Sequence, residues 1–202
     1  MAHHTAAQTA HHHSHEEEHE SLKTMGFWMF LITDVILFSV LFATFIVLRG
    51  NFNGGPGPHE LFQMPGVIAE TFILLTSSFT CGLALLSLNA GKVKGVIGWL
   101  AVTGILGIAF LTLEITEFVH MVHEGATIST SAFLTAFYTL VGTHGLHVTI
   151  GIVWMTGLLI QLKRNGLNAK TKRKVNNLSL YWHFLDIIWI FVFSFVYLMG
   201  VM

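Results

Sequence analysis

The sequence has few of the residues on which most soluble and secreted domains depend. Its 202 residues include one cysteine, Cys81, and three prolines. A single thiol can form no disulfide within the chain and cannot build a metal site that needs two cysteines. Charged residues make up 10% of the chain, against about 25% in a typical soluble domain. The formal net charge of −1 provides no basic surface of the kind that binds nucleic acid.

The sequence is rich in long apolar runs. The chain is 53% hydrophobic and its mean hydropathy is +0.66. Five apolar runs each reach the roughly 20 residues that a helix needs to cross the hydrocarbon of a bilayer. We therefore predict an all-α integral membrane bundle of five transmembrane helices, at about residues 26–48, 67–88, 96–119, 132–162 and 178–202. These spans leave no room for a sizeable soluble domain.

The chain divides into a polar tail and a membrane domain. Residues 1–24 contain seven of the 13 histidines and a cluster of glutamates, and we predict a disordered cytoplasmic tail there. Residues 25–202 form the predicted five-helix transmembrane domain. A Gly/Pro-rich connection at 54–58 is expected to end the first span, because these residues break helices.

The distribution of Lys and Arg predicts the orientation of the chain. Nine of the ten basic residues fall on one side of the predicted membrane, and only Arg49 falls on the other. The nine are Lys23, Lys92, Lys94, Lys163, Arg164, Lys170, Lys172, Arg173 and Lys174. Because basic loops stay in the cytoplasm, we predict a cytoplasmic N-terminus and a periplasmic C-terminus.

Acids and histidines lie inside the apolar runs, where a charge costs a few kcal/mol and usually serves a function. Depth along each helix predicts an inner-to-middle polar cluster that is proton-related or structural: Asp34, His144, His147, His183 and Asp186. It also predicts an outer polar cluster that contacts lipid or another subunit: Glu70, Glu114, Glu117 and His120. Small residues favour close helix packing at Gly104, Gly107, Gly142, Gly145 and the Ser77–Ser78 pair.

Metal-binding patterns in these runs are incomplete. The Glu117-x-x-His120 spacing is that of carboxylate-bridged di-iron bundles, but such a site needs the motif twice and two further glutamates. His144-x-x-His147 is not the His-Glu-x-x-His zinc pattern, and either His144 or His183 could formally bind a haem. We predict no metal in this chain. A stand-alone membrane metalloenzyme using Glu117, His120, His144 and His147, and a proton-coupled carrier, remain as alternatives.

Three strings identify a family resemblance: GFWMFLITDVILFS at 26–39, GTHGLHVTIG at 142–151 and YWHFLDIIWIFVF at 181–193. Together they resemble subunit III of the haem–copper terminal oxidases over about residues 22–202. The five-span length, the His-rich tail and LEITEFVH at 113–120 are most similar to the ubiquinol-oxidising type from bacteria.

The resemblance implies a non-catalytic subunit of a bacterial inner-membrane complex that oxidises ubiquinol, reduces dioxygen to water and pumps protons. Haems and copper would be bound by subunit I, this chain would hold no cofactor other than phospholipid, and its partners would be subunits I, II and IV. A cytochrome c oxidase subunit III is the alternative within the family. Asp34 falls where seven-span members have a carbodiimide-reactive glutamate, and Glu117 falls on the family's acid in the third span. His144, His147, His183 and Asp186 match family positions.

Overall fold

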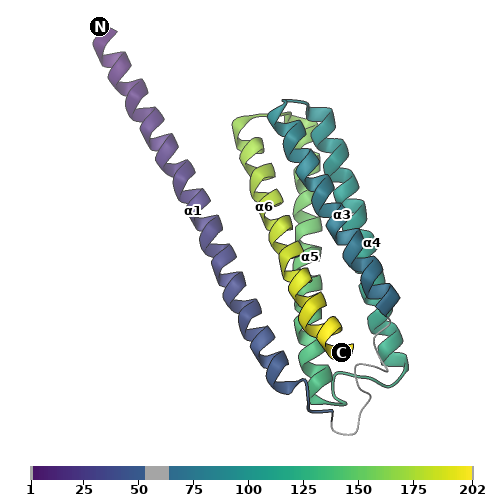
Figure 1. Cartoon of the computed structure of the whole chain (residues 1–202). Helices are drawn as coiled ribbons and strands as arrows, with labels where there is room; N and C mark the ends of the chain where they lie inside the picture. Colours follow the sequence, from purple (N-terminus) through teal and green to yellow (C-terminus); the bar gives the residue numbers. More distant parts are fainter. Residues whose placement is uncertain (1, 53–63, 202) are drawn as a thin grey trace. The chain divides into compact units, whose positions relative to one another are not determined.

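The computed structural model describes residues 2–52 and 64–201, and the regular structure of these residues is helical throughout (Figure 1). The elements are α1 (Ala2–Leu48), α3 (Met64–Asn89), α4 (Val93–His123), α5 (Ala132–Asn165), α6 (Ala169–Val192), the π-helical η1 (Phe193–Leu198) and α7 (Met199–Val201). The Gly/Pro-rich connection predicted at 54–58 lies outside the described residues.

The prediction of five membrane spans is confirmed. Five helical stretches are long and apolar enough to cross a membrane: Thr24–Leu48, Met64–Asn89, Val93–His123, Ala132–Asn165 and Ala169–Leu198. Several are longer than their apolar runs, since helical hydrogen bonding continues into the polar residues on either side. The 34 residues of α5 extend about 51 Å, well beyond the ~30 Å of hydrocarbon. The side of the membrane on which each terminus lies stays a prediction.

The chain separates into two compact units, Met1–Val40 and Leu41–Met202. In the first unit, Leu31, Asp34 and Phe38 share one face of α1, because they follow the three- and four-residue spacing of a helix. The polar residues before Thr24 are part of the same helix in the structure. Our assignment of a separate, disordered tail remains a prediction.

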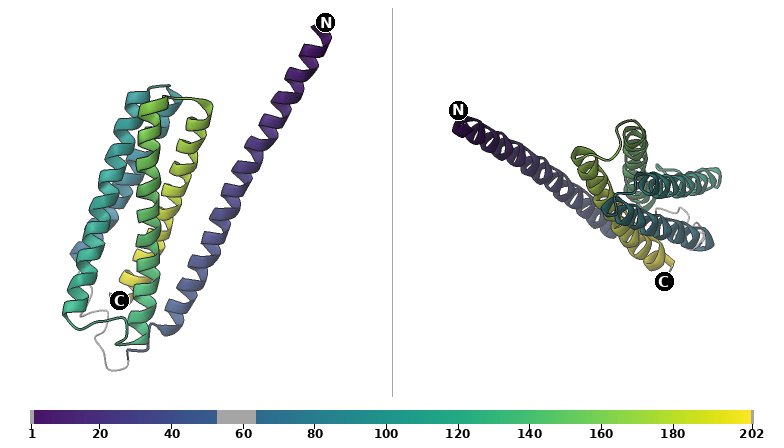
Figure 2. Two further views of the ribbon diagram at one scale, coloured as in Figure 1. Left: turned by 180° about the vertical axis from the view of Figure 1, so that it is seen from behind. Right: turned by 90° about the horizontal axis from the view of Figure 1, so that it is seen from above.

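The second unit is built on a closed ring of four antiparallel helices. Each of α3, α4 and α5 contacts the next helix along the chain, and α6 contacts α3. Two views of this ring are given in Figure 2. Near the end of α1, Phe45 packs on Phe133 of α5, with ring centroids 5.9 Å apart.

Short connections fix the ends of these helices. Gly91 and Gly166 follow α3 and α5 with φ of 69° and 64°, a left-handed conformation that glycine adopts without strain. Asn168 begins α6, and its Oδ1 accepts hydrogen bonds from the backbone nitrogen of Thr171 at 2.9 Å and from the Thr171 hydroxyl at 2.8 Å. Ser131 caps α5 in the same way by accepting from the Leu134 nitrogen.

Two tryptophans of α6 tie the ring together. Trp182 lies against Gly107 of α4 and Gly151 of α5, and its Nε1 donates to Ser77 Oγ of α3 at 3.0 Å. Seven residues later, Trp189 donates from Nε1 to Thr71 Oγ1 of α3 at 3.1 Å. Apolar helices gain little from hydrophobic contact in lipid, so glycine-permitted close packing and these hydrogen bonds connect the four helices.

Basic residues gather at one end of the four-helix unit, where α3 turns into α4 and α5 turns into α6 (top of Figure 1). Eight of the ten Lys and Arg residues lie there: Lys92, Lys94, Lys163, Arg164, Lys170, Lys172, Arg173 and Lys174. The opposite end of the unit carries Arg49. The four-helix unit therefore has a basic end and an end with little basic charge.

Candidate functional site

The predicted outer cluster lies at the less basic end of the unit, between α3 and α4. Glu70 comes from the second turn of α3, and Glu117 and His120 come from the last two turns of α4. These three residues line one cavity of about 170 Å³. The complete lining is Gly66, Glu70, Leu113, Thr116, Glu117, His120 and Met121.

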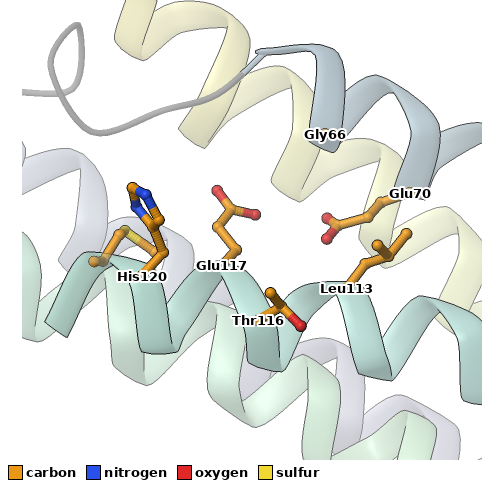
Figure 3. Close-up of a pocket in the computed structure, with 7 residues that line it drawn as sticks. Gly66, Glu70, Leu113, Thr116, Glu117 and His120 are labelled. Atoms are coloured by element: carbon orange, nitrogen blue, oxygen red, sulfur yellow. The ribbon is translucent and has the colours of Figure 1, made fainter. Parts of the chain in front are cut away.

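The two carboxyl groups face each other across this cavity, one from each helix (Figure 3). Glu70 is only 2% exposed, and its Oε2 has no hydrogen-bond partner among residues 2–52 and 64–201. The same holds for Oε1 of Glu117 within the described residues. His120 lies beyond Glu117 in Figure 3, and its Nδ1 is 3.6 Å from Oε1 of Glu124. The cavity therefore presents carboxylate oxygens that no described donor satisfies.

Glu114 lies one helical turn before Glu117 and faces α5 instead of the cavity. A Cβ atom placed on Gly145 would lie 2.8 Å from both Glu114 carboxylate oxygens, so the glycine is what allows this acid to fit. Glu114 interacts electrostatically with Glu70 and Glu117, and neither of its oxygens has a hydrogen-bond partner in the part of the chain that the structure describes. The structure thus brings the three predicted glutamates into one group.

Tyr197 is a member of this group that the sequence did not reveal. It is buried in the π-helical segment η1, packs on Phe137 and Trp189, and interacts electrostatically with Glu70, Glu114 and Glu117. A π-helix changes the direction of the side chains that follow it relative to an α-helix. The tyrosine near the end of the last apolar run was the only signal, and its spacing alone could not place it.

Of the residues predicted for the inner cluster, His183 and Asp186 form a pair. His183 and Asp186 of α6 meet Ser78 of α3: His183 Nδ1 lies 2.7 Å from Ser78 Oγ, and Ser78 also hydrogen-bonds the Asp186 carboxylate. The three side chains line a pocket of about 420 Å³, together with Leu75, Phe79, Gly82, Leu83 and Leu86. Ser78 was expected to pack helices, and it also connects the histidine to the acid.

The two histidines of α5 occupy different surroundings. His144 is completely buried and packs on Trp189 and Phe110, with ring centroids 5.3 Å and 6.0 Å away. His147 donates from Nδ1 to the Thr143 carbonyl of its own helix at 2.7 Å. Asp34 belongs to the unit Met1–Val40 and is described there by itself.

The metalloenzyme alternative required Glu117, His120, His144 and His147 to act together. Glu117 and His120 line the cavity between α3 and α4, whereas His144 is enclosed by aromatic rings. Over residues 2–52 and 64–201, no three His, Cys, Asp or Glu side chains are placed to hold one metal ion. The geometry of the described residues therefore does not support this ligand set.

Comparison with known proteins identifies the family. The sequence matches the family cytochrome c oxidase subunit III over residues 3–201. It is 54% identical to quinol oxidase subunit 3 of Bacillus subtilis over 92% of this chain and 91% of that protein. It is 50% identical to cytochrome bo(3) ubiquinol oxidase subunit 3 of Pseudomonas putida, over 90% and 87% of the two chains. Cytochrome c oxidase subunit 3 of Bacillus sp. PS3 is 49% identical over 88% and 86%.

These matches confirm the resemblance seen in the three sequence strings. The relatives are subunits of bacterial respiratory oxidases, and the chain has five helices able to span a membrane. The protein is therefore a multi-pass protein of the bacterial inner membrane, and it belongs to the cytochrome c oxidase subunit III family of the haem–copper oxidases.

Proposed function

We propose that this chain is the non-catalytic subunit III of a ubiquinol oxidase complex that reduces dioxygen to water and pumps protons. The observation that carries the proposal is the 54% identity, over 92% of the chain, to a protein named quinol oxidase subunit 3. The 49% identity to a protein named cytochrome c oxidase subunit 3 keeps that function as the second candidate.

In this proposal, subunit I holds the haems and copper, and the present chain stabilises subunit I through contacts within the membrane. Subunits II and IV complete the assembly, and phospholipid binds this chain. The contacts between helices support a structural role, because the buried Ser77 and Ser78 and the half-buried Thr71 bond to side chains of α6. These bonds fix the arrangement of the helices, so that a neighbouring subunit contacts a surface of constant shape.

We also propose an orientation for the chain and roles for its polar residues. The N-terminal tail and the basic end of the four-helix unit face the cytoplasm, and the glutamates between α3 and α4 face the periplasmic side. The inner residues of α5 and α6 act in packing or proton handling. Asp34 supports proton uptake from the cytoplasmic side.

The identity of the electron donor tests whether this chain belongs to a ubiquinol oxidase complex. The complex would be purified in mild detergent through a tag on this chain, and oxygen consumption would be measured with ubiquinol and with reduced cytochrome c. We expect haem-bearing subunits to co-purify and ubiquinol to support oxygen consumption. Activity with cytochrome c alone would favour the second candidate, and a preparation without a haem-bearing partner would contradict both.

The role of Asp34 is tested by Asp34→Asn in the assembled complex. Loss of the carboxyl removes a group that can exchange protons, so we expect slower proton uptake and a shorter enzyme lifetime over many turnovers. Thr33→Val is the matched control, since the Thr33 hydroxyl bonds to the Phe30 carbonyl of the same helix at 2.7 Å. Unchanged turnover and lifetime in Asp34→Asn would remove the role.

A further inference from the structure

The cavity between α3 and α4 has carboxylate oxygens on both sides. Glu70 and Glu117 line it from opposite helices, and Glu114 interacts electrostatically with both. Of the ten Lys and Arg residues, eight lie at the other end of the unit, Lys23 belongs to Met1–Val40, and Arg49 lines a separate pocket. No Lys or Arg of the described residues therefore lines the cavity.

A ligand that enters this cavity has to supply hydrogen-bond donors. Glu70 is almost completely buried, and its carboxyl group points into the cavity towards Glu117 (Figure 3). Buried oxygens without partners are costly, and bonds from a charged donor are the strongest that such oxygens form. The volume of about 170 Å³ far exceeds the ~10–15 Å³ that one water molecule needs. A small cationic group fits between the two acids.

The depth of the cavity matches that of lipid headgroups. The 31 residues of α4 extend about 46 Å, which exceeds the ~30 Å of hydrocarbon by about 8 Å at each end of a centred helix. Glu117 lies six residues before His123, about 9 Å from the helix end. Glu70 faces Glu117 across the cavity and so lies at a similar level. Both acids are therefore near the boundary between headgroups and hydrocarbon.

The α4 residue of the lining that lies deepest in the membrane is apolar, as a bound phospholipid requires. Leu113 is one turn closer to the middle of the membrane than Glu117, and it is 38% exposed. His120 lies on the opposite side of Glu117, towards the aqueous end of α4. A headgroup between the two acids would therefore have its acyl chains beside exposed apolar side chains.

We propose that this cavity binds the primary ammonium group of an aminophospholipid, held between Glu70 and Glu117. A primary ammonium has three N–H donors and a positive charge, which the two facing carboxylates complement. Glu114 adds negative charge behind the site without touching the ligand. The inference rests on the proposed assembled complex and specifies the lipid that its outer glutamates recognise.

Selective retention of lipid by the complex tests the site. The purified complex would be exchanged into bilayer discs with equal amounts of phosphatidylethanolamine and phosphatidylcholine, washed in detergent, and its retained lipid measured by mass spectrometry. Phosphatidylcholine is a matched probe, because its quaternary ammonium has the charge but no N–H donor. We expect preferential retention of phosphatidylethanolamine, reduced about tenfold or more by the double variant Glu70→Gln/Glu117→Gln. Glu124→Gln removes an exposed acid outside the cavity lining, and this variant should keep the preference for phosphatidylethanolamine.

A second variant fills the cavity and keeps both acids. Gly66 lines the cavity, and a Cβ atom there would meet nothing within 4 Å. Gly66→Leu, whose Cβ meets no described atom within 4 Å, should therefore reduce retention of phosphatidylethanolamine. Gly98→Leu on α4 is the control, because its Cβ also meets nothing within 4 Å and it does not line the cavity.

Oxygen consumption with ubiquinol, measured on the same preparations, separates failure of the site from failure of the proposed function. An active complex that retains both lipids equally, or whose preference survives in the double variant and in Gly66→Leu, would overturn the site. A carbodiimide-induced bond between Glu70 or Glu117 and a lysine of another subunit would overturn it as well, because a protein ammonium would then occupy the cavity.

Discussion

Replacing Gly107 by alanine should strain the contact at the centre of the four helices. The new Cβ would lie 2.8 Å from Cη2 and 3.0 Å from Cζ2 of Trp182. The indole is held on its other sides as well, because its Cζ3 and Cε3 atoms face Gly151 of α5 and its Nε1 is bonded to Ser77. Overpacking of this kind costs about 1–3 kcal/mol, against which alanine gains up to about 1 kcal/mol in helix propensity. We expect a net destabilisation of up to about 2 kcal/mol.

Equilibrium unfolding by sodium dodecyl sulfate in mixed micelles would measure this change. Gly104→Ala is the matched control one turn away, because its Cβ would meet only the flexible Met155 sulfur at 3.4 Å. The effect of Gly107→Ala should nearly vanish in a Trp182→Phe background, since phenylalanine lacks the atoms that clash. If Gly107→Ala is as stable as Gly104→Ala, or if it destabilises the Trp182→Phe background just as much, the Trp182 contact does not cause the loss of stability.

Three further changes test other contacts of the four-helix unit by the same unfolding measurement. Gly145→Ala should lower the free energy of unfolding by less than Gly107→Ala does, because the Glu114 carboxylate that the new Cβ meets is the end of a flexible side chain. An equal loss would show that this acid is rigidly held. Ser78→Ala should lower the free energy of unfolding by about 1–3 kcal/mol, because it removes the partner of the half-buried His183, and a loss no larger than that of the exposed Thr76→Ala would contradict the bond. Asn168→Ala removes the cap of α6 and should lower the free energy of unfolding by about 0.5–2 kcal/mol. An unchanged free energy of unfolding would mean that the cap contributes nothing.

The membrane spans could be predicted from the sequence because each depends on one local property, the hydrophobicity of about 20 consecutive residues. A run of apolar residues in lipid has to satisfy its own backbone hydrogen bonds, and a helix does so locally. Close packing was also predictable at Gly107 and Gly145, where small residues admit a neighbouring side chain. At Gly142 the nearest atom is 3.9 Å from the Cβ position, so that glycine is not needed for a close approach.

The arrangement of the polar residues was only partly predictable. Depth along a helix correctly brought Glu70 to the level of Glu117. It does not specify the direction in which each helix faces, so His144 and His183 were expected in one cluster although they have different neighbours. Tyr197 lies in a π-helical turn and packs on Phe137 of α5, and neither feature was visible in the spacing of the residues.

In the proposed function, the acids and histidines of this chain connect helices and contact neighbours, while another subunit performs the oxygen chemistry. The most direct measurement is the haem, iron and copper content of this polypeptide after it has been separated from an active, ubiquinol-oxidising complex. We expect these cofactors to remain with the other subunits. A stoichiometric haem or redox metal retained by this chain, with an absorption spectrum that changes on reduction, would contradict it.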